Sequence, residues 1–113
     1  MFKELNSTRT IKEGIKLEDL DFRKLKEFAG KTLKVDGFFF TNGDYGKQLV
    51  VVARDDEGGY KVNMPNRAID QFESIKADKE MLKAVLEGHL EITDIAEQKV
   101  GRGINTVYTL SDC

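Results

Sequence analysis

The chain has 113 residues, of which 40% are apolar and 34% are charged, and its formal net charge is −2. This length and composition fit one globular domain with a single core and exclude an intrinsically disordered chain. No apolar stretch approaches the roughly 20 residues of a membrane-spanning helix, and the N-terminus lacks the apolar core and cleavage site of a signal peptide, so we expect a cytoplasmic protein that does not contact a membrane.

Residues 1–30 indicate an arm followed by one short helix. Apolar residues recur at spacings of three and five within residues 17–28, and Phe22 falls off this stripe. Gly30 follows where a helix C-cap would sit. The pattern predicts a short helix over residues 21–29 that leads into the rest of the domain.

Three strand-like runs follow this helix. Residues 32–41 lead through a polar, glycine-containing loop into residues 47–54, so these two runs predict a hairpin. Residues 60–64 alternate apolar and polar side chains, as a half-buried strand does. The intervening segment, Asp55-Asp56-Glu57-Gly58-Gly59, has the residues of a tight turn, which we favour over a metal site.

A helical stretch over residues 65–88 comes next, and it contains a break. Its first part places apolar residues at spacings of three, namely Ile69, Phe72 and Ile75. Asn66 is a good N-cap for this part, whereas Asp78 interrupts the stripe and is suited to cap a second helix. Gly88 ends the pattern. We therefore expect a broken helix or two short helices that close one end of a barrel.

Two further strands, residues 90–95 and 104–110, predict a second hairpin whose tip contains Gly101-Arg102-Gly103. Five strands with a helix after the third have the order of the OB-fold, a partly open Greek-key barrel. We predict a mainly β fold of one domain, in which residues 1–30 form an N-terminal arm and short helix and residues 31–113 form an OB-fold-like barrel. An α+β sandwich of the same elements is the alternative, because periodicity does not separate the two.

Binding of a single nucleic-acid strand requires aromatic faces for the bases and Lys or Arg for the phosphates. Residues 1–54 contain 11 Lys and Arg against 8 Asp and Glu, whereas residues 55–113 contain 7 against 12. Phosphate contacts depend on the local field rather than on the net charge. The charge distribution therefore permits nucleic-acid binding by the first half of an acidic chain.

The first strand supplies both kinds of residue. Residues of equal parity share one face of a strand, so Lys34, Phe38 and Phe40 are expected on the same side, with the residues between them mostly in the core. The candidate binding residues of the whole chain are Lys34, Phe38, Phe40, Tyr45, Lys47, Arg54, Lys61 and Arg102. A role in the core is the alternative for Phe38, Phe40, Tyr60 and Tyr108.

Catalysis is not expected. His89 is the single histidine, and Cys113, the single cysteine, is the last residue, so neither a metal site with several histidines nor an imidazole-centred triad is favoured. No glycine-rich loop has the spacing of a P-loop. We expect a binding protein with no cofactor and no metal, rather than an enzyme.

Four segments together resemble the small single-stranded-DNA-binding proteins of phages and prophages of Gram-positive bacteria. They are GFFFT at 37–41, YGK at 45–47, LVVVA at 49–53 and GYKVNMP at 59–65, and the resemblance covers about residues 31–111. It implies an OB-fold that binds single-stranded DNA during phage replication or recombination in the host cytoplasm. It also implies an oligomer and contact with replication or recombination proteins.

A second class of function fits the same predicted fold. OB-like barrels have many functions, so a protein-interaction module, such as a phage inhibitor or assembly factor that binds no nucleic acid, is the alternative. For a DNA-binding protein we expect a dimer, because one small barrel presents few stacking surfaces and pairing adds avidity.

Overall fold

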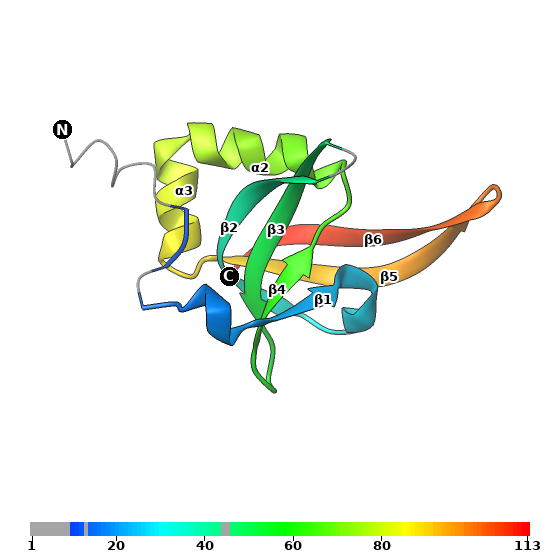
Figure 1. Ribbon diagram of the computed structural model, residues 1–113, viewed down its shortest axis with the longest axis horizontal. Coiled ribbons are helices and arrows are strands. Elements are labelled where there is room, and N and C mark those ends of the chain that lie inside the picture. Colours follow the sequence, from blue (N-terminus) through cyan, green and yellow to red (C-terminus); the bar gives the residue numbers. More distant parts are fainter. Residues whose placement is uncertain (1–9, 13, 44–45) are drawn as a thin grey trace.

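The computed structural model describes residues 10–12, 14–43 and 46–113, and it contains one mixed sheet and two α-helices (Figure 1). Tyr45 lies outside these ranges. The strands are β1 (Asp21–Lys24), β2 (Leu33–Gly43), β3 (Gly46–Arg54), β4 (Gly59–Asn63), β5 (Leu90–Val100) and β6 (Gly103–Asp112). The helices are α2 (Ala68–Ala77) and α3 (Lys79–Leu86), and two 3₁₀ turns, η1 (Leu17–Asp19) and η2 (Leu25–Phe28), flank β1.

The sheet curls into a half-barrel with the strand order β1-β4-β3-β2-β5-β6. Figure 1 shows β2, β3 and β4 in front of the β5–β6 hairpin, with α2 across the top and α3 at one side. The hairpin extends well beyond the other elements. With the hairpin included, the molecule measures 50 Å along its longest axis. In the described ranges, no helix has the length and apolar character needed to cross a membrane.

The predicted mainly β fold with helical segments is confirmed at this level, but the described residues form six strands rather than five. The additional strand is β1, which pairs in parallel with β4 from Asp21 opposite Tyr60 to Lys24 opposite Asn63. The predicted helix over residues 21–29 is therefore wrong, because a strand occupies its first half and the single turn η2 its second. The misleading apolar spacing arose from η2, whose two apolar side chains enter the core.

Residues 25–30 connect the two ends of the curled sheet. Leu25 and Phe28 of η2 are buried in the main core, and η2 contacts β5. The backbone N–H of Gly30 donates to the carbonyl of Ile95 at 2.9 Å. This segment therefore fills the space between β4 and β5 that the open side of the half-barrel would otherwise leave exposed.

The predicted break in the helical stretch is confirmed. Asp78 separates α2 from α3, and its Oδ1 accepts hydrogen bonds from the backbone N–H groups of Glu80 at 3.0 Å and Met81 at 3.2 Å. This is the N-cap arrangement that satisfies free donors at the start of a helix. The first cap differs from the prediction, because α2 begins after Arg67 and Asn66 does not cap it.

A β-bulge in β2 changes which side chains face the core. Leu33 and Val35 are buried as predicted, but the pairing with β3 shifts between Val35 and Gly37, leaving Asp36 as the extra residue. Beyond the bulge the alternation is displaced by one, so Phe38 faces the helices. Its side chain is 0% exposed, and its ring centroid lies 5.1 Å from that of Phe72.

The bulge also brings the chain before β1 against β2. The N–H of Phe38 donates to the carbonyl of Thr10 at 2.9 Å, and the N–H of Lys12 donates to the carbonyl of Asp36 at 2.7 Å. A Cβ at Gly37 would lie 2.5 Å from the Cα of Ile11. Glycine is therefore required at this position by the close approach of the two backbones.

Replacing Phe38 with Ala should destabilise the fold by about 3–5 kcal/mol, because it removes a fully buried ring from the contact with α2. Urea denaturation followed by circular dichroism measures the loss. Phe22→Ala is the matched control, because the same change at a half-exposed ring should cost far less. Equal losses for the two variants would contradict the assignment of Phe38 to the core.

Candidate functional site

The sheet has a core face and an outer face. In β3, Leu49, Val51 and Ala53 belong to the core, so the alternating Val50, Val52 and Arg54 lie on the outer face. Residues opposite each other on neighbouring strands share a face. The outer face can therefore be followed from strand to strand through the observed register.

Phe22 and Lys61 form an aromatic and cationic pair on this outer face. Lys61 of β4 lies opposite Val52 of β3 and also opposite Phe22 of β1. The Lys61 Nζ is 4.4 Å from the centroid of the Phe22 ring, and Phe22 is 54% exposed. A cation over an exposed ring is worth about 0.5–1 kcal/mol. The pair thus presents a large aromatic surface beside a positive charge.

Sequence reasoning missed Phe22 as a site residue. Two signals were available. Phe22 fell off the predicted helical stripe, and it is the one apolar residue in the otherwise charged run from Asp21 to Lys24. An isolated aromatic residue in a charged segment fits an exposed edge strand better than an amphipathic helix.

Lys34 and Arg54 are cross-strand neighbours on β2 and β3, on the same outer face. The Arg54 Nε lies 3.5 Å from the Oδ2 of Asp36, the bulge residue, whose side chain is almost fully buried. Asp36 neutralises part of the positive charge here. Lys34 is exposed and forms no ion pair within the described ranges, although Glu91 of β5 lies opposite it, so each of the two cations has an acidic neighbour.

The chain before β1 covers part of the outer face. Ile15 and Leu20 line a hollow of about 390 Å³ together with Val52 and Arg54. Val52 is almost completely buried although it points away from the main core. The exposed part of the outer face is therefore smaller than the sheet itself. Its aromatic side chains include Phe22, beside Lys61, and the partly buried Phe39, which lies opposite Val50.

Phe40 and Lys47, both predicted site residues, lie together on the helix side of the sheet. The Lys47 Nζ is 4.4 Å from the centroid of the Phe40 ring and forms an ion pair with Glu73 of α2. Phe40 is half-buried and packs against the core. The structure thus brings these two candidate residues together, but they are on the face opposite Lys61, and Lys47 is already paired with an acid.

Tyr108 of β6 is bound to α2. Its hydroxyl donates to the Gln71 Oε1 at 2.6 Å, and the Arg67 Cζ lies 5.5 Å from the centroid of its ring. Burial raises the pKa of Tyr108, and the Arg67 charge opposes this rise. These contacts place Tyr108 in a structural role at the junction of sheet and helix.

The predicted residues thus divide among several places. Lys34, Arg54 and Lys61 share the outer face, whereas Phe40 and Lys47 lie beside α2. Arg102 is exposed in the turn at the far end of the β5–β6 hairpin. Phe38 is buried and not available for stacking, which corrects the expectation that it lies on a binding face.

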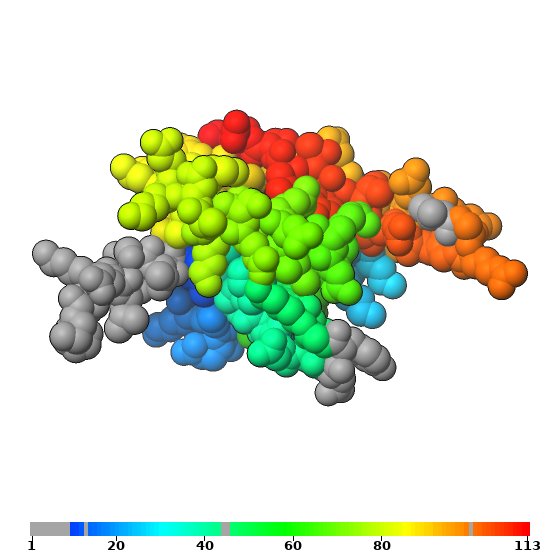
Figure 2. All heavy atoms as spheres, turned by 90° about the horizontal axis from the view of Figure 1, so that it is seen from above, coloured from blue at the N-terminus to red at the C-terminus, as the bar shows by residue number. Residues whose placement is uncertain are grey.

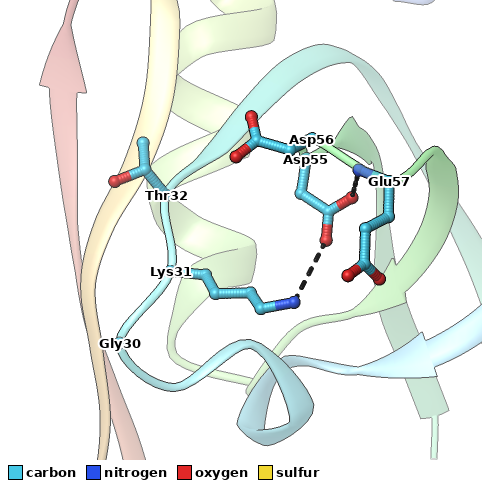
Figure 3. A pocket seen from close by; sticks show the side chains of 6 residues that line it. All are labelled: Gly30, Lys31, Thr32, Asp55, Asp56 and Glu57. Carbon is cyan, nitrogen blue, oxygen red and sulfur yellow. Dashed lines mark hydrogen bonds and ion pairs between the residues drawn. The ribbon is translucent and has the colours of Figure 1, made fainter.

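The turn between β3 and β4 forms a separate polar hollow (Figure 3). Asp55 Oδ1 accepts hydrogen bonds from the N–H groups of Glu57 at 2.8 Å and Gly58 at 3.1 Å, as expected for a tight turn. The Nζ of Lys31 reaches across to within 3.7 Å of Asp55 Oδ2. The hollow has a volume of about 430 Å³. Among the residues that the structure describes, no group of three or more His, Cys, Asp or Glu is arranged to hold a metal.

No family model, curated protein or solved structure matches this chain. The functional assignment therefore depends on the chemistry of the outer face and on the sequence pattern.

Replacing Asp55 with Asn should destabilise the protein at neutral pH. The hydrogen bond from Glu57 and the charge of Lys31 hold the pKa of Asp55 below its usual range, against the opposing effect of burial. Because the folded-state pKa is the lower one, the carboxylate stabilises the fold above its unfolded-state pKa, and this contribution is lost as the pH falls through the folded-state pKa.

Urea denaturation of Asp55→Asn and the unchanged protein from pH 7 downward tests this expectation. The difference in stability should shrink once the pH is below about 4. Asp56→Asn removes the same charge from a neighbouring side chain that makes no hydrogen bond within the described part of the chain, and it should have little effect. A difference that is independent of pH would show that the Asp55 charge is not responsible.

Proposed function

We propose that this chain is a sequence-nonspecific single-stranded-DNA-binding protein built on an OB-like barrel, and that the DNA strand binds across the outer face of β1, β4, β3 and the start of β2. The observation that carries this proposal is the half-exposed Phe22 ring with the Lys61 ammonium 4.4 Å from its centroid. Aromatic faces for bases and cations for phosphates are the two requirements for binding a single strand.

Phe22 supplies the stacking surface. A base that stacks on an aromatic side chain contributes about 1–3 kcal/mol of binding free energy, with little dependence on its identity, because every base has a flat π face. Bases of a duplex are stacked on one another and are not free to do this. The exposed ring therefore favours single strands over duplexes.

The cations of the same face supply the phosphate contacts. Lys61 is next to the ring, and Arg54 and Lys34 follow on the neighbouring strands. For single strands, the affinity falls with salt at a logarithmic slope of about −0.7 for each phosphate that is neutralised. Three contacts predict a slope of about −2.

The order of elements supports an OB-like barrel. Strands β2, β3 and β4 are followed by helices and then by the β5–β6 hairpin, which is the order of that fold, and β1 is an addition at one edge. Together with the sequence resemblance to phage single-stranded-DNA-binding proteins, this order supports the proposal that the protein acts in phage replication or recombination in the host cytoplasm.

Phe22→Ala should weaken binding of a labelled oligo-dT by about 1–3 kcal/mol without changing the salt slope, because it removes stacking but no charge. Lys61→Ala should weaken binding and reduce the salt slope by about 0.7. Fluorescence anisotropy at several salt concentrations measures both effects. Duplex DNA and single-stranded RNA serve as competitors.

Met81→Ala is the matched control for Phe22→Ala, because Met81 is also a half-exposed apolar side chain but lies on α3. It should leave binding unchanged. If the unaltered protein binds no oligo-dT even at low salt, the proposal is wrong and the protein-interaction module becomes the better explanation. Binding that Phe22→Ala does not weaken would place the DNA on another surface.

A further inference from the structure

The two edges of the sheet differ in how they are protected. Edge strand β1 has four residues, of which Asp21, Arg23 and Lys24 are charged. Edge strand β6 has ten residues, and its single charged side chain is Asp112 at its end. Charged side chains and short length are the usual means by which an edge strand avoids pairing with other chains. Strand β1 has both, and β6 has neither.

The free edge of β6 presents a regular set of backbone groups. The two-residue turn joins Val100 to Gly103, which makes these two a hydrogen-bonded pair. Bonding alternates along an antiparallel strand, so Gly103 and the odd-numbered residues after it bond to β5, whereas Ile104 and the even-numbered residues point their N–H and C=O groups outward. The carbonyl of Thr106 fits this direction, because it accepts a hydrogen bond from the Arg67 side chain rather than from β5. The register shift between Thr93 and Ala96 adds a residue to β5 and not to β6, and beyond it the N–H of odd-numbered Cys113 still donates to the carbonyl of His89 at 3.1 Å.

We propose that β6 pairs antiparallel with β6 of a second copy of this chain, around a two-fold axis at Val107. In this register Thr106 lies opposite the partner's Tyr108 and Ile104 lies opposite the partner's Leu110. All of these are even-numbered residues with outward backbone groups, so both pairs are hydrogen-bonded. The two sheets become one continuous sheet with a β6–β6 seam.

Charge complementarity selects this register. A two-fold axis at Val107 places Arg102, in the hairpin turn, opposite the partner's Asp112, and this occurs at both ends of the seam. Both side chains are exposed, and neither forms an ion pair among the residues described. A shift of two residues in either direction loses this match at both ends.

Apolar contact favours the same register. Ile104 is 67% exposed, although it lies on the same face of β6 as Leu110, which packs against the core. Pairing places each Ile104 beside a partly buried Leu110 of the other copy and extends the apolar surface across the seam. Cross-strand pairs of this kind stabilise a sheet.

The edge is accessible. Figure 2 shows the residues of β6, in red, at the surface beside α2 rather than beneath it. Arg67 is the group that occupies this edge, and its side chain must release the Thr106 carbonyl for the second strand to bind. Arg67 is a long exposed side chain at the start of α2, so this exchange requires no change in the fold.

Sedimentation equilibrium without DNA tests the proposal on the full chain at micromolar to high-micromolar concentrations. The unaltered protein should form a dimer. Arg102→Asp and Asp112→Arg should each raise the dissociation constant by on the order of tenfold, because each change converts two attractive pairs of the dimer into repulsive ones. The double variant, with the charges exchanged, should restore the dimer.

Ile104→Pro is an independent check. It removes an N–H that points to the free edge and is not needed for pairing with β5, so it should abolish the dimer while circular dichroism stays unchanged. A protein that is monomeric at all concentrations would overturn the proposal. A dimer that neither charge reversal weakens, or that the double variant fails to restore, would overturn the register. DNA takes no part in these measurements, so their outcome is separate from that of the oligo-dT titration.

Discussion

The bulge at Asp36 in β2 determines which side chains this sheet buries. Before the bulge, Leu33 and Val35 enter the core, and after it Phe38 does so. A strand without the extra residue would keep Phe38 on the outer face with Lys61. The bulge thus places Phe38 and Phe40 on the helix side, where Phe38 packs against Phe72 of α2, and turns Phe39 to the outer face opposite Val50.

Strand β1 adds a half-exposed aromatic group to that face. Its parallel pairing with β4 places Phe22 beside Lys61, and the following turn inserts Leu25 and Phe28 into the core between β4 and β5. The same strand takes the edge position next to β4, so that β6 pairs with β5 alone among the described strands. The proposed DNA surface and the proposed dimer seam are therefore at opposite ends of one sheet and use different groups, side chains in one case and backbone in the other.

Much of the fold could be predicted from local patterns. The two hairpins, the third strand and the break at Asp78 each have a short-range cause, such as alternation, turn residues or a capping side chain, and these were found. Strand β1 was not, because its four residues have little strand signal of their own and it forms only by pairing with β4, nearly 40 residues later in the chain. Tertiary pairing outweighed local propensity there.

The candidate site was predictable in composition but not in arrangement. Lys34, Arg54 and Lys61 could be recognised as exposed cations from their strand positions, and they do share one face. Phe38 was misplaced because alternation holds only within an unbroken register, and a bulge is a property of two paired strands that one strand's sequence does not display. Phe22 was missed because its exposure depends on β1 being a strand.

The most direct test of the proposed DNA surface is a titration of the isotope-labelled protein with oligo-dT, followed by amide chemical shifts in two-dimensional NMR spectra. We predict that the perturbed amides cluster in β1, β4 and the outer-face positions of β3, with the largest changes around Phe22 and Lys61. Perturbations confined to α2 and the β5–β6 hairpin, or none at all under low salt, would contradict it.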